Sequence, residues 1–336
     1  MFFLFNVLQV LRRLLLGRLG YCGFCWLLGC GLWGIIMPVG TLATERAAEK
    51  PAERPAERIA SLDVCTDQLV LLLAKKTDIV GLSTLAQDCK VSVLCQQAQH
   101  VPILPAHAEA ILQVRPSVLF VGPFKASMAQ FVARVLGTKV VIVSPALSLA
   151  DVAAHIMLVA QALGQDERGK QLVVAFQEQL QRLTVPVTDS SPRAILYEAN
   201  GFVMPVGSLA DDVLTHAGMR NVAPLLGVGS VARRVSLETI LLNKPDFLVR
   251  DESARGYSLA QVMLNAPLLL AAFPPSHVVD IPARLWLCGL PQTLEALARL
   301  RRARDHYVYD QVVVHGHSSR KTNSLTILPS FPPLFP

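Results

Sequence analysis

Residues 109–121 read EAILQVRPSVLFV, and residues 238–250 read ETILLNKPDFLVR. Each copy has the pattern E-x-I-L, two further residues, a base, a proline and an apolar run. An acid suits the first turn of a helix because the exposed backbone N–H groups there favour negative charge. The proline favours extended geometry in the residue before it. The repeat therefore predicts a short helix followed by a buried strand, used once in each half of the chain.

Around the first copy, four short apolar runs alternate with helical patterns, and each run ends in a loop rich in Gly, Ser, Asp or Pro. These predicted strands are Ile59 to Leu62, Ile79 to Leu82, Val118 to Val121 and Val140 to Val143. Near-continuous apolar strands separated by helices are typical of a parallel sheet covered on both faces.

Around the second copy the same alternation returns. The predicted strands are Ala194 to Tyr197, Phe247 to Val249 and Val278 to Ile281, with helices near Leu209 to Ala217 and Leu237 to Leu242. Between the two sets, the segment from Glu167 to Leu183 carries Leu172, Phe176, Leu180 and Leu183 on one side. A helix of that length is about 25 Å long and is able to bridge two lobes.

The amino-terminal 43 residues contain three arginines and no acid, followed by the apolar run Tyr21 to Val39 and the small residues before Thr44. This layout predicts a secretory signal peptide that is cleaved after Ala43. Two alternatives remain open. The apolar run approaches the roughly 20 residues of a membrane anchor, and the sequence Leu27 to Cys30 resembles a site of lipid attachment.

The expected organisation follows from these patterns. It comprises a signal peptide at 1–43, a charged tether at 44–57, an N-terminal lobe at 58–146, an interlobe helical segment at 147–184, a C-terminal lobe at 185–304 and an irregular tail at 305–336. Residues 44–298 carry 22 basic and 23 acidic side chains. This balance argues against nucleic-acid binding, which needs a basic face.

Several longer signatures accompany the element order. They are RIASLDVCTDQLV at 58–70, IVGLS at 79–83, AEAILQVRPSVLFVGPF at 108–124, LYEANG at 196–201 and ARLWLCGLPQTLEAL at 283–297. With the duplicated E-x-I-L unit, they resemble the helical-backbone periplasmic binding proteins of ABC importers, the group that includes cobalamin, iron-siderophore and haem receptors. The resemblance covers residues 58–302; after Leu300 the expected final helix runs into Arg301, Arg302 and Arg304, which leaves its packing open.

The resemblance implies an α/β fold with two Rossmann-like lobes, parallel-rich sheets, a single bridging helix and a ligand cleft between the lobes. It implies a periplasmic substrate-binding protein, monomeric and without cofactor, catalytic residues or resident metal. Its partners would be an ABC permease with its ATPase subunits and a small-molecule metal chelate. One glutamate of each lobe contacts permease arginines in this family, which identifies Glu109 and Glu238 as docking residues.

Loops at the carboxyl ends of the strands are the expected walls of the cleft, because ligands of open α/β sheets bind there. The candidate ligand-binding residues are Asp63, Cys65, Thr66, Thr84, Phe124, Tyr197, Asn200, Arg284, Trp286 and Cys288. Phe124, Tyr197 and Trp286 are suited to stacking on a flat macrocycle, and Arg284 to pairing with an anionic chelate. Asp67, at the start of the first helix, is interpreted as structural.

The cysteines leave several interpretations open. Cys65 and Cys288 follow strands of opposite lobes and could be inert, free thiols in the pocket, a pair that contacts ligand or, as the least favoured option, an interlobe disulfide. Cys89 and Cys95 are close enough in sequence to pair locally. An exported protein occupies a compartment where disulfides persist.

Three other functions compete with the transport interpretation. An exported α/β enzyme is suggested by the glycine-rich segment 227–232, although Pro224 interrupts the strand that a dinucleotide site requires. A receptor for bare metal ions would use His100, His107, His155 and His216, whose spacing shows no cluster. A structural or adhesion role is the third.

Overall fold

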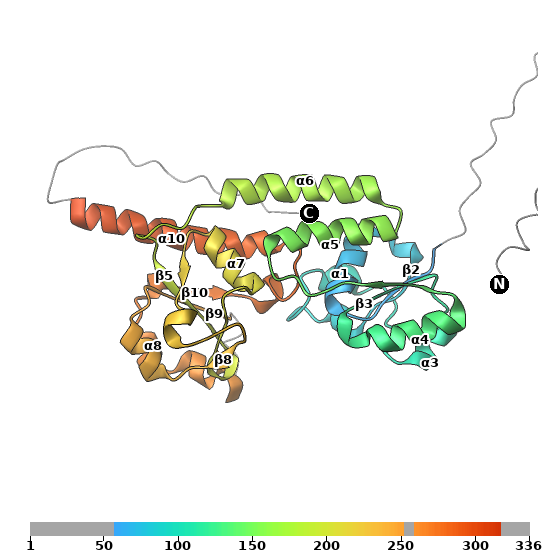
Figure 1. Ribbon diagram of the computed structural model, residues 1–336, viewed down its shortest axis with the longest axis horizontal. Coiled ribbons are helices and arrows are strands. Elements are labelled where there is room, and N and C mark those ends of the chain that lie inside the picture. Colours follow the sequence, from blue (N-terminus) through green and yellow to red (C-terminus); the bar gives the residue numbers. More distant parts are fainter. Residues whose placement is uncertain (1–56, 252–258, 317–336) are drawn as a thin grey trace, which may run out of the picture. The chain divides into compact units, whose positions relative to one another are not determined.

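The computed structural model describes residues 57–251 and 259–316 (Figure 1). The expected signal peptide, all of the tether except Glu57, and the tail beyond residue 316 lie outside the described residues. Within the described residues, no helix combines the length and the apolar character that a bilayer crossing requires.

The N-terminal lobe is built on a four-stranded sheet whose order is β2-β1-β3-β4 and whose pairs are all parallel. Its strands are β1 (Ile59–Ser61), β2 (Ile79–Gly81), β3 (Val118–Val121) and β4 (Lys139–Ile142). Along β3, Val118 and Phe120 point into one buried cluster, whereas Leu119 and Val121 point into another. Both faces of this sheet are therefore covered, as the unbroken apolar runs predict.

The helices of this half are α1 (Val64–Leu73), α2 (Cys95–Ala98), α3 (Ala108–Val114), α4 (Ala126–Leu136) and α5 (Leu149–Ala162), with the 3-10 turns η1 (Lys76–Asp78), η2 (Thr84–Gln87) and η3 (Pro123–Lys125). Three connections leave the same edge of the sheet. They follow β1, β2 and β3 and lead into α1, η2 and η3. Because parallel strands share their carboxyl edge, these three loops lie together.

The C-terminal lobe contains a mixed sheet of order β10-β9-β5-β6-β8, in which β7 also pairs with β5. Its central pairs, β10 with β9 and β9 with β5, are parallel. The strands are β5 (Arg193–Glu198), β6 (Phe202–Val203), β7 (Arg220–Asn221), β8 (Arg233–Arg234), β9 (Phe247–Asp251) and β10 (Val278–Ile281).

The helices of this half are α7 (Leu209–His216), α8 (Leu237–Asn243), α9 (Pro267–Ala271) and α10 (Thr293–Gly316), with the 3-10 turns η4 (Ala199–Gly201), η5 (Ala223–Leu226), η7 (Leu259–Asn265), η8 (Pro275–His277) and η9 (Ala283–Leu285).

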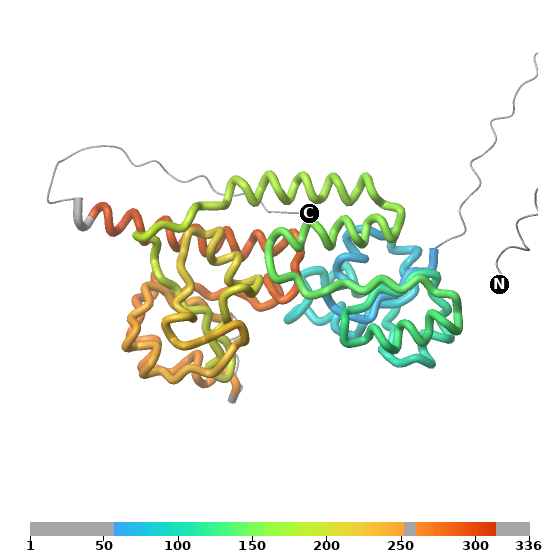
Figure 2. The backbone as a smooth tube through the Cα atoms, viewed as in Figure 1, coloured from blue at the N-terminus to red at the C-terminus, as the bar shows by residue number. Residues whose placement is uncertain are grey.

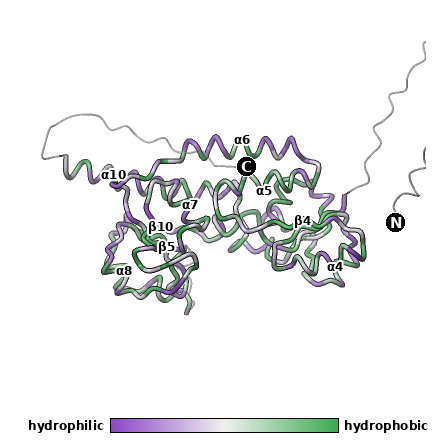
Figure 3. Tube along the Cα trace, in the orientation of Figure 1, coloured by the Kyte–Doolittle hydropathy of each residue, from purple (hydrophilic) through white to green (hydrophobic). Residues whose placement is uncertain are grey.

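The predicted bridging helix is α6 (Asp166–Leu183), which packs against α5 of one half and α10 of the other. Figure 2 shows its path along both helices. In Figure 3 most of α6 is hydrophilic, and its buried residues are Gly169, Phe176 and Leu183. Phe176 belongs to an apolar cluster that also contains Val152 of α5 and Leu297 of α10. The two halves thus share a continuous core through the bridge.

The duplicated sequence forms the same structure twice, α3 with β3 and α8 with β9. The residue before each proline departs from expectation, since Arg115 (φ 50°) and Lys244 (φ 43°) are left-handed and not extended. The reason is helix termination: the Arg115 N–H donates to the Ile111 carbonyl at 2.9 Å, which closes α3 one residue before the proline.

An arginine directly before or at the start of the neighbouring strand contacts each of these helix ends. The Arg58 guanidinium donates to the Val114 carbonyl at 2.6 Å, and the Arg193 guanidinium donates to the Lys244 carbonyl at 2.6 Å. Charged donors suit the carbonyls that a helix leaves unpaired at its C-terminus. The internal duplication therefore extends to a contact that the repeat alone did not reveal.

The prediction of an irregular tail from Asp305 is wrong as far as Gly316, because α10 continues to that residue. Arg301 pairs with Asp305 one turn later at 2.7 Å. Tyr307 packs edge-on against Phe247 and donates to Asp246 at 3.2 Å. The ion pair within α10 and the two Tyr307 contacts with β9 and its preceding turn stabilise a helix whose own sequence lacks clear apolar periodicity.

Candidate functional site

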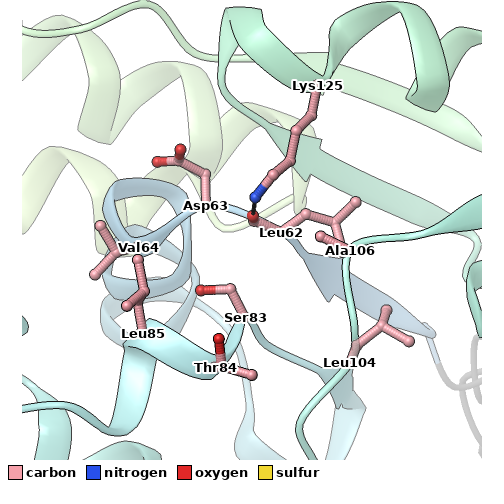
Figure 4. A pocket seen from close by; sticks show the side chains of 9 residues that line it. All are labelled: Leu62, Asp63, Val64, Ser83, Thr84, Leu85, Leu104, Ala106 and Lys125. Atoms are coloured by element: carbon pink, nitrogen blue, oxygen red, sulfur yellow. Dashed lines mark hydrogen bonds between the residues drawn. The ribbon is translucent and has the colours of Figure 1, made fainter.

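A pocket opens at the carboxyl edge of the N-terminal sheet, where the loops after β1, β2 and β3 meet. It is lined by Leu62, Asp63, Val64, Ser83, Thr84, Leu85, Leu104, Ala106 and Lys125, and its volume is about 110 Å³ (Figure 4). Apolar side chains form part of its wall, and the polar groups come from all three loops. The structure therefore gathers polar side chains at the edge where the sequence predicts ligand binding.

Asp63 joins the pocket to the first helix. It is the N-cap of α1, and its Oδ1 accepts from the Cys65 N–H at 3.0 Å. A Cβ added at Gly122 would lie 3.1 Å from Asp63 Oδ2, so the absence of a side chain there lets the loop after β3 approach this carboxylate. The carboxylate is half-buried in the pocket wall.

Lys125 brings a positive charge into the pocket, at the end of η3. Its ammonium donates to the Leu62 carbonyl, and Figure 4 shows the side chain reaching from the β3 loop to the end of β1. Lys125 forms no ion pair with any described residue, Asp63 included. Lys125 was not among the predicted ligand-binding residues, although it is a base directly after Phe124, which was predicted.

Ser83 and Thr84 begin η2 and line the side of the pocket opposite Lys125 in Figure 4. The Ser83 hydroxyl donates to Asp67 Oδ2 at 2.5 Å, and its N–H donates to Asp67 Oδ1 at 3.3 Å. Thr84 is exposed, and its hydroxyl has no hydrogen-bond partner among the described residues. The Ser83 hydroxyl thus forms a hydrogen bond within the protein, whereas the Thr84 hydroxyl is available to a ligand.

Asp67 is buried behind this wall, and burial raises its pKa to about 6 despite the hydrogen bonds from Ser61 and Ser83. Its interpretation as structural rested on the amides at the start of α1. The hydroxyl and the N–H of Ser83 both donate to this carboxylate, which ties the loop after β2 to α1.

Three predicted ligand-binding residues of the N-terminal half, Cys65, Thr66 and Phe124, fall outside the pocket lining. Thr66 is buried, with its hydroxyl bonded to the Asp63 carbonyl at 3.0 Å and to the Ser61 hydroxyl at 2.7 Å, so it holds the turn into α1 and does not face solvent. Phe124 is 97% exposed, directly before Lys125, and is available for stacking.

The aromatic residues predicted in the C-terminal half are corrected by the structure. Tyr197 is fully buried in the core of the C-terminal sheet, and its hydroxyl has no partner among the described residues. Trp286 is buried in the cluster that connects the two halves. Neither ring is exposed for stacking on a ligand, because strand and loop positions near a sheet edge do not determine which way a side chain points.

Polar residues of the C-terminal half lie at the ends of β5, β9 and β10. Asn200 is exposed with φ 59°, and Arg284 in η9 is half-buried without a partner among the described residues. Glu198, which was not predicted, ends β5, and burial together with nearby Asp251 raises its pKa to about 7.

Cys65 and Cys288 form a disulfide, the option that the sequence favoured least. Cys65 lies in the first turn of α1 next to Val64 of the pocket, and Cys288 lies four residues beyond Arg284. The segment from Arg284 to Cys288 is therefore tied to the rim of the N-terminal pocket. Cys89 and Cys95 form the second, local disulfide.

Glu109 and Glu238 occupy equivalent places in the first turns of α3 and α8, and both are exposed. A hydrogen bond from its own backbone amide, and then the His107 side chain, lower the pKa of Glu109. The pKa of Glu238 is lowered by its own amide and then by Ser236. Both carboxylates are ionised at neutral pH and point away from buried partners.

Within the described ranges, no group of three or more His, Cys, Asp or Glu side chains is arranged to hold a metal ion.

Comparisons with known proteins agree with this architecture. A family model described as periplasmic binding protein matches residues 59–285. No match was found among curated proteins.

Among solved structures, the periplasmic heme-binding protein RhuT from Roseiflexus sp. RS-1 is 22% identical, with a TM-score of 0.59 over 74% of this chain and 100% of that one. HutB, a periplasmic heme-binding protein of Vibrio cholerae, is 19% identical, with a TM-score of 0.60 over 75% and 99%. The vitamin B12 binding protein BtuF of Vibrio cholerae is 18% identical, with a TM-score of 0.57 over 75% and 98%.

Proposed function

Because the chain belongs to the periplasmic binding protein family, whose fold binds substrates and is not catalytic, we propose that it is the substrate-binding component of an ABC importer. Its cargo is a bulky metal chelate of the cobalamin, ferric-siderophore or haem class, which it delivers to the membrane permease and its ATPase subunits. The observation that carries this proposal is the polar pocket at the carboxyl edge of the N-terminal sheet, inside the segment that the family model matches.

The cargo class is tested by thermal melting of the protein without residues 1–43, against cobalamin, haem and a set of ferric siderophores. A ligand that binds the native state raises the melting temperature by mass action, by an amount that grows with ligand concentration. We expect one chelate class to produce this rise. A melting temperature that no chelate changes would contradict the proposal.

Docking to the permease is proposed to use Glu109 and Glu238. Two ionised carboxylates in equivalent first turns, one in each half, support a two-point contact with arginines of the permease. Such charge complementarity directs orientation and association more than affinity.

Charge reversal tests this contact. The double variant Glu109→Lys/Glu238→Lys should reduce ligand import at least tenfold, while the Kd of the free protein for its ligand stays unchanged. The matched control is Glu167→Lys/Glu178→Lys on the exposed side of α6, which changes the net charge equally and should import normally. Normal import by the first variant would remove the assignment.

Export is proposed to depend on residues 1–43, and the mature protein is proposed to be a periplasmic monomer. Mass spectrometry of the protein from the periplasmic fraction should give a chain that begins at Thr44. A chain that retains residues 1–43 would indicate a membrane anchor, and an acylated Cys30 at the new amino terminus would indicate a lipid anchor.

A further inference from the structure

The pocket beside α1 is too small for the proposed cargo as a whole. Its volume is about 110 Å³. Sites that enclose a whole drug-sized molecule have volumes of about 300–1,000 Å³. A bulky chelate can therefore place only one peripheral substituent here, and the chemistry of the pocket selects that substituent.

The charges of the wall do not favour an anionic group. Lys125 contributes one positive charge, but Asp63 contributes a carboxylate to the same lining. A second carboxylate, Asp67, lies directly behind Ser83. An anion would be attracted by one ammonium and repelled by two carboxylates when both are ionised. A cationic group would meet the ammonium of Lys125 as it entered.

The hydrogen-bonding groups of the wall require both a donor and an acceptor from the ligand. The Lys125 ammonium has three N–H donors, of which the structure commits one to the Leu62 carbonyl. Ser83 already donates its hydroxyl hydrogen to Asp67, so its oxygen presents only acceptor capacity to the pocket. The Thr84 hydroxyl is able to donate or accept.

A primary amide satisfies this arrangement, because its carbonyl accepts from Lys125 while its NH₂ group donates to Ser83. A carboxylate offers acceptors only. It would place an acceptor oxygen against the Ser83 oxygen with no hydrogen between them, because Ser83 already donates its hydrogen to Asp67, and such an acceptor pair is unfavourable.

We infer that this pocket binds a neutral primary amide at the periphery of the ligand, so that the protein selects an amide-bearing corrinoid over carboxylate-bearing porphyrins or ferric carboxylate chelates. This inference rests on the proposed function and deepens it. Lys125, Ser83 and Thr84 are the residues that make the selection.

Two ligands with the same corrin ring provide the test. Dicyanocobinamide carries amides around the ring, and cyano-ligated cobyrinic acid carries carboxylates in their place. Titration calorimetry of the protein without residues 1–43 should give a Kd for the amide ligand at least tenfold below that for the acid. Equal binding, or tighter binding of the acid, would overturn the inference.

Variants of the pocket residues test whether this pocket determines the preference for the amide ligand. Lys125→Met should raise the Kd for dicyanocobinamide about tenfold, and Thr84→Val, at an exposed position that tolerates the change, should raise it severalfold. Asp63→Asn keeps an N-cap residue on α1 but removes the negative charge from the pocket wall. It should therefore lower the Kd for cobyrinic acid and reduce the preference of the protein for the amide ligand over the acid. The matched control is Lys139→Met, since Lys139 also donates to a backbone carbonyl, that of Ala162, but does not line the pocket.

The outcomes separate the two proposals. If haem or a ferric carboxylate chelate binds tightly and the corrinoids do not, the proposed function stands and the amide inference is overturned. If the corrinoid binds but neither Lys125→Met nor Thr84→Val changes its Kd, the pocket assignment is wrong. If no chelate of any class binds, both proposals are contradicted.

Discussion

Asp67 carries the least favourable charge that the structure places near the pocket. Its carboxylate is buried, and its pKa is raised from 3.8 to about 6. Between these two values the folded protein binds a proton that the unfolded chain has released. The free energy of unfolding contributed by this residue therefore falls as the pH rises from about 4 to about 6.

Replacing Asp67 with Asn should remove this dependence. A shift of about two pKa units corresponds to roughly 3 kcal/mol, at 1.36 kcal/mol per unit. Urea unfolding at pH 4, 5, 6 and 7 should show that Asp67→Asn gains stability relative to the wild type as the pH rises, by about 1–3 kcal/mol at pH 7. A constant difference across this range would show that Asp67 does not titrate as its burial implies.

Single residues of the site were only partly predictable from sequence. Asp63 and Thr84 follow strands and line the pocket, and their contact with a ligand stays a prediction. Tyr197 was predicted to end a strand, but β5 continues to Glu198; the Tyr197 ring is buried, and Glu198 is partly exposed. Side chains alternate along a strand, so an error of one position exchanges an exposed residue for a buried one. Lys125 lies one position beyond the loop that was considered.

At the scale of elements, the α5–α6 contact shows how closely the bridging helix is held. A Cβ added at Gly169 would lie 2.5 Å from the Cβ of Ala160, closer than two carbon atoms can approach. Glycine inside a helix is normally unfavourable by about 1 kcal/mol relative to alanine. The close packing of the two helices explains its presence in α6.

Gly169→Ala should therefore destabilise the protein, by about 1–3 kcal/mol, in spite of the better helix propensity of alanine. Chemical denaturation monitored by circular dichroism measures this change. The double variant Gly169→Ala/Ala160→Gly moves the methyl group to the other helix and should recover much of the loss. If Gly169→Ala is neutral or stabilising, the two helices are less closely packed than the structure shows.

Most elements of the two sheets could be predicted because their sequences are unbroken apolar runs between turn residues. Val118–Val121 and Val278–Ile281 were predicted with their observed bounds. The end of α10 was missed for a tertiary reason, since its stability beyond Asp305 depends on Tyr307 packing against Phe247, about 60 residues away in the chain. The short strands β6, β7 and β8 have two residues each and leave no periodic signal.

At the scale of the whole molecule, the Cys65–Cys288 disulfide joins residues 223 positions apart, whereas Cys89–Cys95 joins residues 6 apart. Chain-entropy arguments give about 5 kcal/mol for closing the longer loop and about 2 kcal/mol for the shorter one. The two bonds therefore contribute very differently to the stability of the native state.

The contributions of the two disulfides to stability can be compared by removing each one from this protein in turn. Cys65→Ser/Cys288→Ser should lower the free energy of unfolding by about 2–5 kcal/mol, and Cys89→Ser/Cys95→Ser should lower it less. Guanidinium unfolding of both variants without reductant measures the difference. A larger loss in the second variant would show that local packing around Cys89 outweighs loop closure.

The pairing also determines how the protein must be assembled. Cys65, Cys89, Cys95 and Cys288 occur in this order, but the bonds are nested, with Cys89–Cys95 enclosed by Cys65–Cys288. A chain that enters an oxidising compartment amino terminus first exposes Cys65 and Cys89 long before Cys288. An oxidase that joins cysteines in order of emergence would link Cys65 to Cys89, and exchange with another thiol would then be needed to release it. Correct maturation of this protein is thus expected to depend on a disulfide isomerase and not on an oxidase alone.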